Sequence, residues 1–90
     1  MLDENVFQAM LNPLSDVNLD FLEALALEAK GTDRPVKTSA LEHRLGITHG
    51  TFQTYRKRLL DTGLVNSLRR GELSFAVPLL AHYVLQRREE

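Results

Sequence analysis

Residues 45–77 read LGITHGTFQTYRKRLLDTGLVNSLRRGELSFAV, and this stretch contains the signals that decide the fold. Thr48 is a good N-cap and Gly63 a good C-cap, so the residues between them predict a helix over 49–62. Beyond that helix, apolar and polar residues alternate on both sides of residues 69–71, an Arg-Arg-Gly turn. This alternation predicts a β-hairpin with a basic tip.

A shorter helix is predicted directly before this stretch. Thr38 or Ser39 is expected to cap its start, Ser39 and Glu42 have the spacing of a capping box, and Gly46 ends it. Residues 36–37 predict a brief strand before it. Two helices joined by a short turn that contains glycine form the helix-turn-helix pattern.

Three further helices are predicted outside the helix-turn-helix. Residues 4–11 carry apolar side chains at helical spacing after Asp3, a plausible N-cap. A longer helix is expected over residues 17–30, with Gly31 as its left-handed C-cap. Pro78 is expected to open a final helix, because proline is tolerated at a first helical position.

This order of elements predicts a mainly α-helical fold with a small β-hairpin wing. We interpret it as a winged helix-turn-helix, of the DNA/RNA-binding three-helical bundle type, with extra N- and C-terminal helices. The chain is expected to be a single domain, with residues 1–16 as an N-terminal helical extension and residues 17–90 as the winged helix-turn-helix.

Composition limits the class of protein. Ninety residues correspond to one small domain, and the absence of cysteine excludes disulfides, thiolate metal sites and cysteine nucleophiles. No apolar run approaches the roughly 20 residues of a membrane helix, so no membrane partner is expected. The acidic start lacks the layout of a signal peptide, which predicts a cytoplasmic protein.

The net charge of −1 conceals a strong asymmetry. Residues 1–33 have seven acids against one base, a net −6, whereas residues 34–71 have eight bases against two acids, a net +6. Residues 72–90 have a net charge of −1. A polyanion would therefore meet a basic middle segment, although the two opposite blocks could equally attract each other within one fold.

The predicted helix at 49–62 has a polar outward face. At 100° per residue, Phe52 and Leu59 fall on the buried side, while short hydrogen-bonding residues and then two cations face outward. Threonine and glutamine can read base edges, and lysine and arginine can neutralise phosphates. Arg56 falls in the apolar stripe, where its stem should pack while its head reaches solvent or an acid, and Asp61 should end the contact surface.

Double-stranded DNA is therefore the expected partner, and the alternative is an ordinary solvated helix. The predicted DNA contacts are Thr48, His49, Thr51, Gln53, Thr54, Lys57 and Arg58 of this helix, Arg69 and Arg70 of the hairpin, and Lys37 and Arg44 of the preceding segment.

Metal and catalytic sites are not expected. His43, His49 and His82 lie on three different predicted helices without acidic or thiolate partners at ligand spacing. The chain contains no phosphate-cradling glycine loop, nucleophile elbow or isolated carboxylate pair. We expect no enzyme activity and no cofactor in this chain.

From VKTSALEHRLGITHGTFQTYRKRLLDTGLV through GELSFAVPLLAHYVL, the chain resembles the C-terminal winged-helix domains of bacterial and archaeal P-loop ATPases of the AAA+/STAND type. The resemblance covers roughly residues 17–85. Its sharper part is the strand that ends at Phe75, followed by Pro78-Leu79-Leu80 and Tyr83-Val84. The family usually has Asp-Pro-Leu-Leu at this point, and this chain has Val77 in place of the aspartate.

The resemblance implies a DNA- or partner-contacting module that an attached ATPase moves or regulates. ATP would then bind only to an upstream ATPase module, because the nucleotide-binding motifs are not in these residues. The positions that match DNA contacts in such domains are Thr51, Gln53, Thr54, Lys57, Arg58, Arg69 and Arg70.

Two alternatives stay open. One is a standalone transcriptional regulator that forms a homodimer through the helix at 6–11 and the terminal helix, which would set two recognition helices about one DNA turn apart. The other is a protein-interaction winged helix that folds against its own ATPase and binds no DNA.

Overall fold

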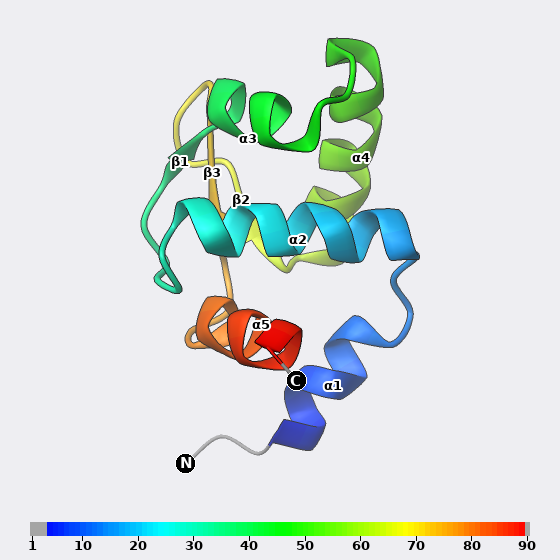
Figure 1. Cartoon of the computed structure of the whole chain (residues 1–90), viewed down its shortest axis with the longest axis vertical. Coiled ribbons are helices and arrows are strands. Elements are labelled where there is room, and N and C mark those ends of the chain that lie inside the picture. Colours follow the sequence, from blue (N-terminus) through cyan, green and yellow to red (C-terminus); the bar gives the residue numbers. More distant parts are fainter. Residues whose placement is uncertain (1–3, 90) are drawn as a thin grey trace.

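The computed structural model describes residues 4–89, and this part of the chain contains five helices and a small three-stranded antiparallel sheet (Figure 1). The helices are α1 (Glu4–Leu11), α2 (Asp16–Glu28), α3 (Thr38–Leu45), α4 (His49–Thr62) and α5 (Leu80–Glu89). The strands are β1 (Val36–Lys37), β2 (Val65–Asn66) and β3 (Glu72–Phe75).

Helix α2 lies across the middle of the molecule, with α3 and α4 on one side and α1 and α5 on the other (Figure 1). Ser15 caps its start by accepting a hydrogen bond from the Asn18 N–H at 3.3 Å. Phe21 and Leu22 are fully buried, and so is nearly all of Ala24, which falls outside the main apolar stripe. A helix that is covered on more than one side needs apolar residues beyond a single stripe.

The end of α2 differs from the prediction of a helix over residues 17–30. The helix ends at Glu28, and Lys30 (φ 55°) and Gly31 (φ 74°) are both left-handed. The Gly31 N–H donates to the Ala26 carbonyl at 2.9 Å, which ends the helix in a Schellman motif. Gly31 is left-handed, as predicted, but the C-cap residue is Ala29, two positions earlier. A Cβ at Gly31 would also lie 3.2 Å from Leu85 Cδ1 of α5.

The strand order of the sheet is β1-β3-β2, so β3 is the central strand. Val36 of β1 pairs with Leu73, and Val65 of β2 pairs with Phe75. All four of these side chains are buried, so the sheet presents apolar residues to the helices. The predicted β2–β3 hairpin and the brief strand at 36–37 are confirmed, although Val77 lies outside β3.

The predicted capping box of α3 is wrong. The N-cap residue is Lys37, and no side chain forms a cap hydrogen bond. Thr38 is already helical, and its N–H donates to the Gly71 carbonyl at 2.9 Å. Because strand β1 runs directly into α3, Ser39 lies inside the helix, and Glu42 pairs with His49.

The prediction that Pro78 opens the last helix is also wrong, because α5 begins at Leu80. Leu79 is left-handed (φ 67°), and the Leu80 N–H donates to the Val77 carbonyl at 3.2 Å, so Pro78 lies in a turn before the helix. A left-handed non-glycine residue costs about 1–2 kcal/mol. This turn places Leu80 and Ala81 of α5 fully inside the core, which offsets that strain.

Helix α1 joins the same core as α2. Phe7 and Leu11 are buried in it, and the Phe7 ring stacks on Tyr83 of α5 with 5.1 Å between centroids. The Tyr83 hydroxyl donates to Gln8 Oε1 at 2.9 Å. The expected N-cap of this helix, Asp3, lies outside the described residues.

Candidate nucleic-acid interface

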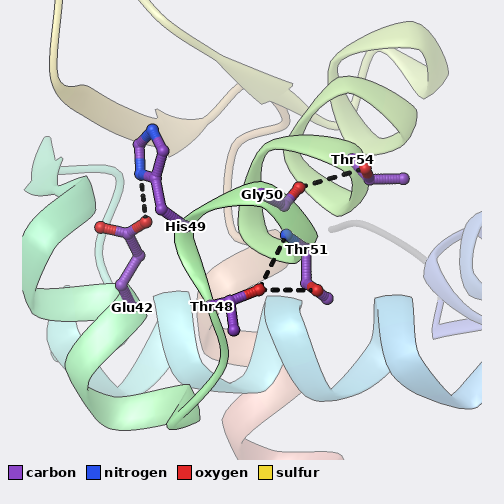
Figure 2. A network of polar contacts seen from close by, with 6 residues as sticks. All are labelled: Glu42, Thr48, His49, Gly50, Thr51 and Thr54. Atoms are coloured by element: carbon purple, nitrogen blue, oxygen red, sulfur yellow. Dashed lines mark hydrogen bonds and ion pairs between the residues drawn. The ribbon is translucent and has the colours of Figure 1, made fainter.

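The turn between α3 and α4 fixes where α4 begins. Gly46 is left-handed (φ 66°), and its N–H donates to the Glu42 carbonyl at 2.9 Å. Thr48 then caps α4, since its hydroxyl oxygen accepts a hydrogen bond from the Thr51 N–H at 3.3 Å (Figure 2). The predicted start and end of this helix, including the left-handed C-cap at Gly63 (φ 79°), are confirmed.

The orientation of α4 follows from two buried side chains, one aromatic and one aliphatic. Phe52 and Leu59 are fully buried, and the Phe52 ring stacks on Phe21 of α2 with 5.1 Å between centroids. These contacts direct the opposite face outward. The exposed side chains of that face are Gln53, Thr54, Lys57, Arg58 and Asp61, as the helical phase predicts.

Two of the three threonine hydroxyls at the start of α4, those of Thr48 and Thr54, already donate within the protein. Thr48 Oγ1 donates to Thr51 Oγ1 at 2.9 Å, and Thr54 Oγ1 donates to the Gly50 carbonyl at 3.2 Å (Figure 2). Thr51 is also only half-exposed. A ligand would therefore meet the Thr48 and Thr54 hydroxyls as acceptors, whereas the Thr51 hydroxyl accepts from Thr48 and keeps its hydrogen. Gln53 is the exposed residue of the first turns whose amide can both donate and accept.

His49 is placed by the preceding helix. Its Nδ1 lies 2.6 Å from Glu42 Oε1, and three quarters of its side chain is exposed (Figure 2). This contact ties the first residue of α4 to the last turns of α3. It also places one carboxylate beside an otherwise basic and polar surface.

The cations predicted to contact DNA fall into two classes. Lys57 is exposed and forms no ion pair with any side chain that the structure describes, and the Arg58 guanidinium lies 6.0 Å from the Tyr55 ring centroid. Arg44 instead pairs with Glu28 of α2, with 2.6 Å between Nη2 and Oε2 and 2.9 Å between Nε and Oε2. Its charge is thus largely compensated, unlike that of Lys57.

The two arginines at the tip of the β2–β3 hairpin are exposed but face different hollows. Arg70 lines a hollow of about 370 Å³ between the starts of α3 and α4 and the hairpin tip, whereas Arg69 lines another beside Pro35 and Leu68. The residues around the Arg70 hollow are Thr38, His49, Gln53, Arg56, Arg70 and Gly71. Lys37 is exposed at the end of β1, opposite Glu72 of β3, and does not line this hollow.

Arg56 is the residue whose hydrogen-bond partner the sequence did not predict. Its side chain is half-buried, as expected, and its Nη2 donates to Ser67 Oγ of the hairpin at 3.1 Å, where an acid was the expected protein partner. The Ser67 hydroxyl donates in turn to the Glu72 carbonyl at 3.1 Å. Arg56 therefore braces α4 against the hairpin. Its place inside the apolar stripe is the sequence signal that marks it as unusual.

The described residues contain no group of three or more histidine, cysteine or carboxylate side chains that could hold a metal ion. None of the helices in this part of the chain is both long enough and apolar enough to cross a membrane.

Comparison with known proteins gives one match. A family model described as "Domain of unknown function (DUF8462)" matches residues 4–84. No curated protein and no solved structure matches the chain. The description of the family states no activity or partner, so the resemblance to ATPase C-terminal domains stays a prediction.

Proposed function

The chain belongs to the DUF8462 family of domains of unknown function, and we propose that it is a non-catalytic winged helix-turn-helix module that binds double-stranded DNA. In this proposal α4 is the recognition helix, which enters the major groove, and the β2–β3 hairpin is the wing. The arrangement that supports it is the order of α3, a short turn that contains glycine, α4 and the antiparallel β2–β3 hairpin. Strand β1, which precedes α3, pairs with β3 and completes the sheet.

The open face of α4 is the observation that carries the proposal. Gln53 and Lys57 are exposed and form no hydrogen bond or ion pair with other side chains in the described part of the chain. Unpaired donors of this kind suit base edges in the first turns and phosphates further along the helix. Gly50, in the first turn of α4, leaves open space above the backbone, which would allow close approach of a duplex.

The contact surface has defined limits. Asp61 lies exposed on the last turn of α4 and would repel phosphates, so contact should be confined to the first three turns. Arg70 extends the surface to the wing, because it lines the same hollow as Gln53. Arg44 is held by Glu28 and should contribute less than the sequence suggests.

The test is binding of a labelled duplex by fluorescence anisotropy as salt is raised. We expect Lys57→Ala and Arg58→Ala each to weaken binding and to reduce the salt slope by about one, because each cation neutralises one phosphate. Arg87→Ala, on α5 at the other side of α2, is the matched control and should leave both quantities unchanged. Absence of binding at low salt, or binding indifferent to both α4 substitutions, would favour a protein-interaction module.

The resemblance to ATPase C-terminal domains adds a second, separable part to the proposal. We expect that an ATPase module is joined to the N-terminal side of this domain, where α1 lies on the opposite side of α2 from α4 (Figure 1). An attached module on that side would leave the α4 face open. The parent reading frame tests this expectation, since an upstream G-x-x-x-x-G-K-[ST] motif is required.

A further inference from the structure

Two arginines line the hollow between α4 and the hairpin. Arg56 reaches it from α4 and Arg70 from the hairpin tip, and both line its wall. The other lining residues, Thr38, His49, Gln53 and Gly71, are polar or glycine, and none of them is acidic.

Neither guanidinium is neutralised by the protein. The hydrogen-bond partner of Arg56 is the Ser67 hydroxyl, which is uncharged, and neither Arg56 nor Arg70 forms an ion pair with a described side chain. Charged groups that are partly removed from water are normally paired, so a half-buried Arg56 that lines the same hollow as a second arginine favours an anion.

One carboxylate does reach a lining residue. Glu42 Oε1 lies 2.6 Å from Nδ1 of His49, so this acid is directed at the imidazole ring. It does not line the hollow. The start of α3 lies at the same wall through Thr38, and no side chain caps that helix. The Thr38 N–H already donates to the Gly71 carbonyl, and the partial positive charge of the helix start adds to the charge of the two arginines.

We propose that this hollow binds one phosphate group, with Arg56 and Arg70 as its two cationic ligands. In the proposed function, on which this assignment of the source rests, the group is a phosphodiester of the duplex that lies between the recognition helix and the wing. Arginine forks suit phosphate oxygens, and the volume of about 370 Å³ leaves room for the attached sugar groups. Arg56 then both braces the wing through Ser67 and binds the phosphate.

The first test titrates the folded chain with inorganic phosphate and follows the Arg56 and Arg70 Nε–H signals and the Gly71 amide by NMR. We expect saturable shifts. Arg56→Gln and Arg70→Gln should each lower the phosphate affinity by about tenfold or more, because each removes a charged hydrogen bond. Arg87→Gln is the matched control and should bind phosphate like the unchanged protein. Absence of saturable shifts, or affinity unaffected by both substitutions, would overturn the site.

Arg56→Gln separates binding from bracing. Glutamine retains an amide N–H that can donate to Ser67 but removes the charge, so a merely structural Arg56 would leave the phosphate affinity unchanged. Thermal unfolding of each variant checks the fold. Arg70 lies exposed in a turn, so Arg70→Gln should fold and keeps the test valid if Arg56→Gln does not.

The second test uses the labelled duplex and compares salt slopes. If both arginines bind one phosphate, the Arg56→Gln/Arg70→Gln double substitution should reduce the slope by about one in total, and each single substitution by no more than that. A reduction of the salt slope by about two in the double variant would overturn the shared phosphate site but would not contradict the proposed duplex binding. Binding of inorganic phosphate without any duplex binding would support the hollow but overturn both its duplex source and the proposed function.

Discussion

Two aromatic pairs on opposite sides of α2 have nearly the same geometry. Phe7 and Tyr83 stack at 5.1 Å with 27° between their planes, and Phe21 and Phe52 stack at 5.1 Å with 28°. The first pair joins α1 to α5 and carries a polar contact, the hydrogen bond from the Tyr83 hydroxyl to Gln8. The second pair is apolar and fully buried.

The difference lies in what each pair leaves open. At the first pair, α1 and α5 pack against each other, and the Tyr83 hydroxyl already donates its hydrogen bond to Gln8. Phe52 anchors only the inner face of α4, so Gln53 and Lys57 on its outer face have no described partner. The same stacking interaction thus joins two helices on one side of the molecule and leaves an exposed polar face of α4 on the other.

Phe52→Ala should have the largest effect on this comparison. It removes a fully buried ring from between α2 and α4, and we expect a loss of about 3–5 kcal/mol in the free energy of unfolding, measured by urea denaturation. Phe7→Ala is the matched substitution on the other side. Its loss should lie at the low end of that range, because Phe7 is 5% exposed and lies on the first described helix.

Duplex binding separates the two variants further. Under conditions where both remain folded, Phe7→Ala should bind the duplex like the unchanged protein, and Phe52→Ala should bind more weakly because α4 loses its anchor. Equal stability losses together with equal binding would contradict the division of the molecule by α2.

Gly50→Ala should separate stability from binding on the open face. Gly50 is helical, and a Cβ there meets no atom within 4 Å, so alanine should stabilise the fold by about 0.5 kcal/mol. The added methyl group should weaken duplex binding, because it separates the backbone from the groove. A variant with higher stability and undiminished affinity would show that the duplex does not approach Gly50.

Gly63→Ala is the control for this pair of effects. Gly63 is left-handed (φ 79°) at the other end of α4, so alanine should destabilise the fold by about 1 kcal/mol. Its site has equally open space but lies beyond the proposed contact surface. Duplex affinity of the folded fraction should not change.

The smallest expected effect concerns the ion pair between Glu28 and Arg44. A double-mutant cycle with Glu28→Ala and Arg44→Ala should give a coupling energy of roughly 0.2–1 kcal/mol that decreases with salt, because both side chains are partly exposed. Arg44→Ala should also weaken duplex binding less than Lys57→Ala. A coupling energy of zero, together with a large loss of duplex binding in Arg44→Ala, would show that Arg44 is not held by Glu28 and contacts a phosphate of the duplex.

The limits of sequence reasoning are clearest at α4 and its neighbours. Both ends of α4 were predicted, because Thr48 and Gly63 act on backbone groups within a few residues. The start of α3 was not predicted, because the Thr38 N–H bonds to Gly71, which is far away in the sequence. Pro78 was misplaced for a related reason, since the left-handed Leu79 is held by burial of the helix that follows it.

The candidate interface divides in the same way. The helical period was enough to place Gln53 and Lys57 outward and Phe52 inward, because side-chain direction in a helix depends on local geometry alone. No period could pair Arg44 with Glu28 or Arg56 with Ser67, or direct Arg69 and Arg70 to different hollows. Those contacts join different elements.

The sequence by itself determined the order of the elements, the limits of α4 and the face that α4 turns to solvent. Short-range hydrogen bonds and apolar spacing carry that information. The tertiary structure decided which cations stay unpaired and brought Arg56 and Arg70 to the same hollow. Ion pairs and hollows depend on distances between elements, and only the packing of α3 and α4 against α2, and of the hairpin against α4 and β1, sets those distances.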